Sequence, residues 1–226
     1  MNTAIIVAAG SGTRFDSASP KQFLDLAGKP VLLHSLQSFQ DSSVIDEIIV
    51  VVGNEHIDRL HSIIAGASIT KLRAVVGGGA SRSESVKNGF DAVDLATVVV
   101  CVHDGVRPLV TVDEIARTVK CAEENGAACL TAPVVDTIKS VEYGKIVATI
   151  DRTTLRRALT PQAFRHYVLK RALEQRFNAE NATDECVLVE RSGVIVTTVD
   201  GSPGNIKITH REDLIMAEAI IRGAAE

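Results

Sequence analysis

Short apolar runs rich in valine and isoleucine recur along the chain, separated by segments with helical spacing. The runs cover residues 4–8, 47–52, 72–76, 97–102, 127–132 and 194–199. Each run is apolar throughout rather than alternating, which predicts strands covered on both faces in a mainly parallel sheet. Apolar residues at helical spacing occupy 31–40, 56–65, 83–93, 112–125 and 211–222, the last helix with Thr209 as its N-cap. This order predicts an α/β fold with an open twisted sheet, whose ligands bind beyond the carboxyl ends of the strands.

Residues 136–152 depart from this alternation, because they read as a strand, a Tyr143-Gly144 turn and a second strand. An isolated two-stranded hairpin is barely stable in water, and this one carries several apolar residues. The hairpin must therefore cover its own core or pack against a second subunit. We favour a homodimer in which this segment is a protruding arm; the alternative is a flap on the same chain.

The composition favours one domain spanning residues 1–226, since 226 residues with 46% hydrophobic content can bury a substantial core. The net charge of −4 and the lack of Trp argue against nucleic acid and membrane surfaces as partners, so local cations must hold any anionic substrate. We see no signal peptide and no stretch of membrane-spanning length. The four cysteines have no CxxC spacing and are expected to be buried thiols in a reducing cytoplasm.

The first run leads into a glycine-rich loop, AAGSGTR at residues 8–14. Glycines there let backbone N–H groups approach phosphate oxygens closely. Phe15 occupies the third glycine position of a dinucleotide fingerprint, and the G-K-[ST] of a P-loop is missing. About twenty residues of polar loop run to Val31, a length that is usually functional. Within this loop, Arg14 and Lys21 are placed to fold back on one triphosphate.

Two further loops follow strand-like runs. GGGASRSESV at 77–86 presents backbone groups of Gly78 and Gly79 to a ligand, although a purely structural turn is the alternative. HDGVRP at 103–108 places Asp104 at the mouth of the most apolar run, where a carboxylate must be paired. Mg²⁺ bridging to phosphate oxygens and a salt bridge with Arg107 are the two alternatives for that partner.

Five cations lie beside strand ends or loops of this acidic chain: Arg14, Lys21, Arg107, Arg152 and Lys207. Taken singly, each is more typical of a solvated surface. Together they form the pattern expected of a protein that binds two phosphorylated substrates.

The motifs, in this order, resemble those of the 2-C-methyl-D-erythritol 4-phosphate cytidylyltransferase family of the non-mevalonate isoprenoid pathway. They are AAGSGTRF…PKQ, GGGASRSESV, HDGVRP, DTIK, DRTTLRRALTPQ, TDE and NIKIT, and they cover nearly the whole chain, to about residue 209. The departures are small. HDGVRP stands where HDAARP is common, Ala80 stands where an acidic residue can occur, and Glu185 ends a motif that is more often TDD.

The resemblance implies a Rossmann-like, GT-A-like nucleotidyltransferase that uses Mg²⁺ to join CTP and methylerythritol phosphate, releasing pyrophosphate. A phosphate monoester is already a dianion near neutral pH, so the attack needs no catalytic base, and catalysis is positioning plus charge neutralisation. The implied catalytic residues are Arg14, Lys21, Arg152 and Lys207, and the implied Mg²⁺ ligand is Asp104. The implied nucleotide contacts are Ala8, Ala9, Gly10, Gly12, Gly78, Gly79 and Ser85. The implied contacts to the sugar-alcohol phosphate are Asp104, Arg107, Thr137, Arg152, Thr160 and Lys207, with Arg152 entering the neighbour's site in the family's dimer.

Other functions stay open at this point. Ribitol 5-phosphate cytidylyltransferases share several of these motifs, but their first loop more often contains AGG. Sugar-1-phosphate nucleotidylyltransferases usually add a second metal-binding Asp late in the chain, where this sequence has Lys207. A dinucleotide-dependent dehydrogenase is disfavoured by Phe15, and a non-catalytic nucleotide sensor has no use for Asp104 and converging cations.

Overall fold

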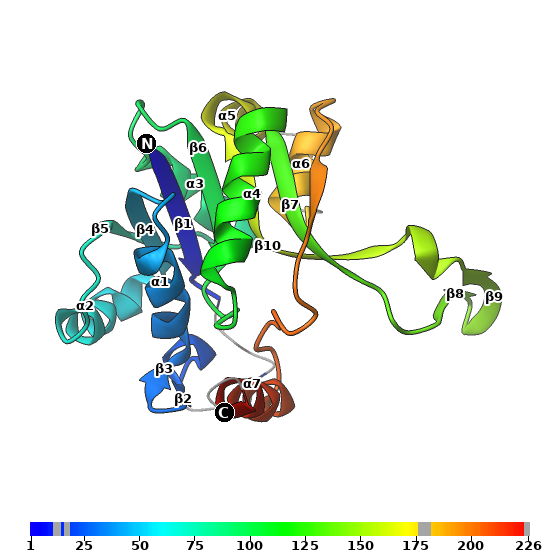
Figure 1. Ribbon diagram of the computed structural model, residues 1–226, viewed down its shortest axis with the longest axis horizontal. Coiled ribbons are helices and arrows are strands. Elements are labelled where there is room, and N and C mark those ends of the chain that lie inside the picture. The colour runs from blue at the N-terminus through cyan, green and yellow to red at the C-terminus, as the bar shows by residue number, and fades with distance from the viewer. Residues whose placement is uncertain (11–14, 16–18, 176–181, 224–226) are drawn as a thin grey trace.

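A seven-stranded sheet forms the centre of the computed structural model, which describes residues 1–10, 15, 19–175 and 182–223 (Figure 1). In the order β11-β7-β10-β6-β1-β4-β5, the strands are β11 (Thr197–Asp200), β7 (Ala127–Pro133), β10 (Arg156–Arg165), β6 (Val99–Asp104), β1 (Asn2–Ala8), β4 (Glu47–Val52) and β5 (Leu72–Gly77). β10 runs antiparallel to both of its neighbours, and the other pairings in this sheet are parallel. The predicted α/β fold with a mainly parallel open sheet is confirmed.

Helices cover both faces of the sheet, which explains why its strands are apolar throughout. One face packs against α1 (Val31–Asp41), α2 (Ile57–Ala65), which follows η3 (Asn54–His56), and α4 (Val112–Asn125). The other face packs against α3 (Arg82–Asp91), α5 (His166–Glu174) and α6 (Glu185–Arg191). Neighbouring residues of β1 point to opposite sides, so Ile6 lies in the first core and Ile5 in the second, both fully buried.

The predicted helices are confirmed within a few residues, whereas β10, α5 and α6 escaped prediction. β10 contains charged residues at both ends and a proline in the middle, and only its central part is buried, so it lacks the apolar run that marks the other strands. α6 has seven residues, too few for a helical period to show. Thr209, the predicted N-cap of the last helix, lies two residues before the helix begins at Arg211, and its hydroxyl donates to the carbonyl of Lys207. The carboxylate of Asp213 accepts hydrogen bonds from the backbone N–H groups of Thr209 and His210.

The segment between Lys21 and Val31 is more ordered than the predicted polar loop. It contains the short helix η2 (Lys21–Phe23) and a two-stranded sheet of β2 (Asp25–Leu26) and β3 (Lys29–Pro30). The last helix, α7 (Arg211–Gly223), contacts β2 and contributes Ala217 to a third buried cluster with Leu26. Among the described residues, no helix is both long and apolar enough to cross a membrane.

The predicted hairpin is confirmed as β8 (Ile138–Glu142) and β9 (Lys145–Ile150), followed by η4 (Arg152–Thr154), and it projects away from the body of the protein (Figure 1). Tyr143 and Gly144 both have positive φ angles, 49° and 76°, as the favoured two-residue hairpin turn requires. Ile146 and Val147 remain 66% and 53% exposed. The alternative of a flap packed on the same chain therefore gains no support, and the dimerisation role stays a prediction.

Candidate functional site

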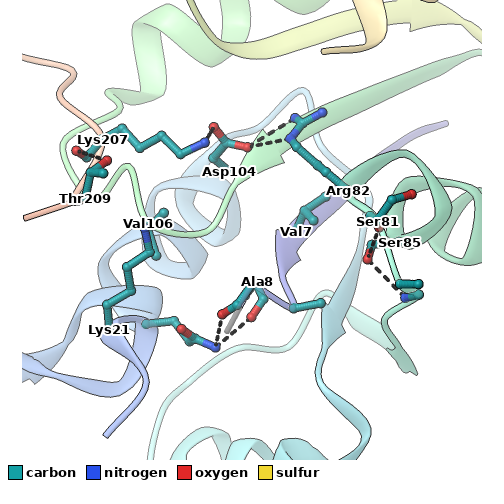
Figure 2. A pocket seen from close by; sticks show the side chains of 15 residues that line it. Val7, Ala8, Lys21, Ser81, Arg82, Ser85, Asp104, Val106, Lys207 and Thr209 are labelled. Atoms are coloured by element: carbon teal, nitrogen blue, oxygen red, sulfur yellow. Dashed lines mark hydrogen bonds and ion pairs between the residues drawn. The ribbon is translucent and has the colours of Figure 1, made fainter. Parts of the chain in front are cut away.

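A cavity of about 450 Å³ lies at the carboxyl ends of β1 and β6, beside the glycine-rich turn after β5 (Figure 2). This is the position at which open α/β sheets bind ligands. The cavity brings together eight of the predicted site residues: Ala8, Ala9, Gly10, Lys21, Gly79, Ser85, Asp104 and Lys207. The cavity therefore lies at the sheet edge where the sequence places the site, and the roles of these residues stay a prediction.

Asp104, the last residue of β6, is the charged centre of this cavity. Its Oδ2 atom lies 2.9 Å from Nζ of Lys207, and its Oδ1 atom lies 3.1 Å from Nη2 of Arg82 (Figure 2). Nε of Arg107 lies 3.4 Å from the same Oδ2 atom. Burial on its own would raise the pKa of Asp104, but the three cations outweigh burial and hold this pKa below its ordinary value. The Asp104–Arg107 salt bridge that the sequence left as an alternative is therefore present, as part of a larger cluster.

Arg82 is a member of the cavity wall that the sequence reasoning missed. It follows Ser81, the N-cap of α3, and its side chain reaches Asp104 and Glu185. Its position in GGGASRSESV, directly after the glycine-rich turn, was the available signal, but an arginine at a helix start is more often solvated. Only the folded structure, in which the side chain of Arg82 reaches the end of β6 and the start of α6, reveals its partners.

The first loop is held in place by Gln22, a second residue that the sequence reasoning missed. Nε2 of Gln22 donates to the backbone carbonyl of Ala8 at 2.8 Å, and Gln22 is 1% exposed. The neighbouring Lys21 is also buried, and its Nζ donates to the carbonyl of Ile208 at 2.8 Å. The Pro-Lys-Gln sequence therefore supplies a cation to the cavity and an amide that fixes the end of β1.

The glycine-rich turn after β5 is a close-packed structure. A Cβ atom on Gly78 would lie 2.3 Å from Cβ of Ala9, so no other residue fits there without movement of the first loop. Oγ of Ser85 accepts a hydrogen bond from the N–H of Gly79 at 3.1 Å and donates to the carbonyl of Ser81 at 2.9 Å. Gly78 does not line the cavity itself, and it acts by allowing this approach.

Thr160 and Arg107 lie directly behind Asp104 rather than in the cavity wall. Oγ1 of Thr160 accepts a hydrogen bond from the N–H of Asp104 at 3.1 Å and lies 2.9 Å from Nδ1 of His103. Burial lowers the pKa of His103 to about 3, so its imidazole is neutral at pH 7. Because Nε2 of His103 lies 3.2 Å from the carbonyl of Arg107 and must donate to it, Nδ1 accepts the hydroxyl proton of Thr160.

Besides Gly78, Arg107 and Thr160, two more of the predicted residues that the structure describes lie outside the cavity wall. Thr137 and Arg152 flank the hairpin strands and are exposed, and the guanidinium of Arg152 donates to the backbone carbonyl of Val135. Gly12 and Arg14 lie outside the described residues. Within a single chain, the structure therefore brings Lys21, Asp104, Arg107 and Lys207 together, but not Arg152.

Asp104 fits the predicted role of a Mg²⁺ ligand. Among the described side chains, no group of three or more His, Cys, Asp or Glu residues is arranged to hold a metal ion. Mg²⁺ does not need such a group when a substrate supplies phosphate oxygens, because it commonly takes one or two carboxylates and keeps several waters. An ionised carboxylate in the cavity wall meets that requirement.

Comparison with known proteins gives a single consistent family. Residues 2–223 match the family model described as 2-C-methyl-D-erythritol 4-phosphate cytidylyltransferase. The chain is similar to the protein of that name from Syntrophus aciditrophicus, with 41% identity over 97% of this chain and 95% of the relative. A relative from Alkaliphilus metalliredigens, with the same name, is 42% identical over 97% of this chain and 92% of its own length.

Solved structures agree with this comparison. The crystal structure of 4-diphosphocytidyl-2C-methyl-D-erythritol synthase from Anaerococcus prevotii superimposes with a TM-score of 0.86 and 30% identity, covering 98% of this chain and 96% of that one. The cytidylyltransferase from Thermus thermophilus gives a TM-score of 0.77 and 33% identity, covering 98% of this chain and all of that one. The similarity therefore extends from the motifs to the fold of nearly the whole chain.

Proposed function

The chain belongs to the 2-C-methyl-D-erythritol 4-phosphate cytidylyltransferase family, and we propose that it joins CTP and 2-C-methyl-D-erythritol 4-phosphate. The products are 4-diphosphocytidyl-2-C-methyl-D-erythritol and pyrophosphate. The observation that carries this proposal is the cationic cluster around Asp104 in a cavity walled by glycine-rich turns. Such a cavity suits two polyanionic substrates, because it neutralises their charge without supplying a proton acceptor.

Separate groups of residues contact the nucleotide, its triphosphate and the acceptor phosphate. Backbone groups of the first loop and of the turn after β5 bind the nucleotide, at Ala8, Ala9, Gly10, Gly12 and Gly79, with Ser85 beside them. Gly78 contributes by letting the turn approach Ala9. Lys21 and Arg14 neutralise charge on the α-phosphate and on the departing pyrophosphate. Lys207 and Arg107, both in contact with Asp104, hold the acceptor phosphate on the other side of that carboxylate. The neutral imidazole of His103 is committed to two hydrogen bonds, which agrees with a reaction that requires no base.

In this proposal Asp104 is the residue that would hold Mg²⁺. The ion, when bound, neutralises charge that develops on the phosphate oxygens during the displacement. The remaining acceptor contacts, from Thr137 and Arg152, come from the arm of a second subunit. The exposed apolar side chains of that arm support the homodimer, since an isolated hairpin has no other way to bury them.

A pyrophosphate-release assay across the four ribonucleoside triphosphates tests the proposal, with methylerythritol phosphate and ribitol 5-phosphate as acceptors. We expect release with CTP and methylerythritol phosphate, and little with the other pairs. An Asp104→Asn variant serves as the control for contaminating activity, and it should lose turnover. Preference for ribitol 5-phosphate, or release that does not depend on an acceptor, would contradict the proposed reaction.

A further inference from the structure

Arg82, Asp104 and Glu185 form a chain of contacts that links three separate elements. Arg82 is the first residue of α3, Asp104 the last residue of β6 and Glu185 the first residue of α6. Arg82 and Asp104 line the cavity, whereas Glu185 does not. Glu185 is therefore a buried carboxylate that reaches the cavity only through Arg82.

The guanidinium of Arg82 donates hydrogen bonds to Glu185 and Asp104 from different nitrogen atoms. Nη1 donates to Oε1 of Glu185 at 2.6 Å, while Nε and Nη2 donate to Oδ1 of Asp104 at 3.2 and 3.1 Å. A guanidinium is planar and presents its donors in a fixed fork, so anchoring one edge sets the direction of the other. Glu185 thus determines how Arg82 meets Asp104.

Glu185 is a fully buried carboxylate, and burial of a carboxylate carries a desolvation cost. Its side chain is 0% exposed, and its Oε2 atom has no hydrogen-bond partner among the described residues. Burial raises the pKa of Glu185, and the attraction of Arg82 opposes that rise only in part. The ion pair with Arg82 therefore offsets the desolvation cost of this carboxylate in part.

Cations contact both oxygens of Asp104, and these contacts restrict the orientation of its carboxylate plane. Arg82 occupies Oδ1, which leaves Oδ2 facing Lys207 at 2.9 Å (Figure 2). Arg107 lies 3.4 Å from the same Oδ2 atom. The backbone N–H of the same residue is held by Thr160. We propose that Arg82 and Glu185 are positioning residues: Glu185 anchors the guanidinium of Arg82, and Arg82 fixes the orientation of the Asp104 carboxylate for the reaction. This inference rests on the proposed function for its kinetic test only.

Glu185→Gln separates a positioning role from a structural one. Glutamine keeps the size and one acceptor oxygen, but it removes the charge that anchors Arg82. We expect kcat to fall by a factor on the order of 10², since small displacements of a reacting constellation have effects of that size, with little change in the KM for CTP. The free energy of unfolding in urea should change little, because Arg82 stays paired with Asp104 and the desolvation cost of the Glu185 charge is removed at the same time. A purely structural role would instead lower activity and stability together.

Arg82→Lys tests whether the fork itself is needed. Lysine keeps the positive charge but cannot contact Glu185 and Asp104 with a fixed geometry, so we expect kcat to fall as in Glu185→Gln. Asp91→Asn is the matched control, because it breaks an exposed ion pair with Lys87 on the same helix, 2.5 Å long, away from the cavity. The control should keep the activity and stability of the original protein. Normal turnover in Arg82→Lys would overturn the proposal.

A second readout is independent of the reaction. In ¹⁵N-labelled protein, the Nε–H signal of Arg82, assigned by its loss in Arg82→Lys, should exchange slowly with solvent because it is hydrogen-bonded. Glu185→Gln should make that exchange faster. Unchanged exchange, or unchanged kcat in Glu185→Gln, would overturn the positioning role. If the original protein releases no pyrophosphate with any acceptor, the proposed function fails while the exchange measurement still decides whether Glu185 anchors Arg82.

Discussion

Single side chains in the cavity divide into those that face a ligand and those that hold the others in place. Lys21 and Lys207 line the cavity, while Gln22 and Thr160 fix the ends of the strands that carry it. The surplus of cations keeps Asp104 ionised at neutral pH despite its burial. Charge neutralisation by oriented groups is an effective form of catalysis because these groups need no reorganisation when the substrate's charge moves.

Lys21→Ala tests the proposed catalytic use of a buried cation. Loss of one oriented charge of this kind should reduce kcat by a factor on the order of 10² to 10³. The dissociation constant for CTP, measured by calorimetry, should change much less, because backbone groups provide many of the nucleotide contacts. Lys29→Ala, which removes an exposed lysine of β3, is the control and should have no effect. An equal loss in kcat and in CTP affinity would mean that Lys21 only binds.

The secondary-structure elements form a rigid frame for the cavity because they pack closely. α3 approaches the sheet at Gly89, where a Cβ atom would lie 2.6 Å from Cγ2 of Ile5 and 2.9 Å from Cγ2 of Val51. This approach places the N-terminal turn of α3, with Ser81 and Arg82, beside the end of β6. Helix-to-sheet distance therefore sets the position of one wall of the cavity.

Gly89→Ala should destabilise the protein even though alanine favours helices more than glycine does. The added methyl group would overpack the contact with Ile5 and Val51, at a cost of about 1–3 kcal/mol, which exceeds the gain of about 1 kcal/mol in helix propensity. Urea unfolding measures the difference. Gly66→Ala, at the end of α2, meets its nearest atom at 3.9 Å and should be neutral or stabilising. If both variants were equally stable, the close approach of α3 would be disproved.

At the scale of the whole molecule, the arm formed by β8 and β9 stands apart from the rest of the described chain (Figure 1). β8 and β9 project from the body, and the exposed apolar side chains of the arm have no cover within the described chain (Figure 1). The exposure of Thr137 and Arg152 has the same origin, since both lie at the base of this arm. A symmetric dimer would bury the arm and carry these residues to another subunit.

Mixing two inactive variants tests this arrangement. In a dimer of Lys21→Ala with Arg152→Ala, one site would lack both residues and the other would be intact, if Arg152 acts on its neighbour. Random mixing of subunits should then restore about a quarter of the original turnover, because half of the dimers are mixed and each has one working site. Each variant mixed with itself is the control. Absence of recovery, or a concentration-independent monomer in sedimentation, would contradict the shared site.

Much of the architecture follows from local patterns. Apolar runs such as residues 47–52 predicted strands buried on both faces, and the turn chemistry of Tyr143-Gly144 predicted the hairpin, because burial and backbone conformation depend on adjacent residues. The same holds for the loops at strand ends, where the strand order of an α/β sheet brings Ala8 and Asp104 to one edge. β10 was hidden because its charged ends and proline mask a strand that is buried only in part.

The motif order alone indicated the family, and the residue types alone indicated two polyanionic substrates. The contacts within the site were decided by the folded structure. Arg82 meets Asp104 across 22 positions of sequence and Glu185 across 103, and no local pattern encodes contacts of that separation. They arise because β6 lies next to β1 in the sheet while α3 and α6 pack on the same face of it, so that three unrelated segments meet at one carboxylate.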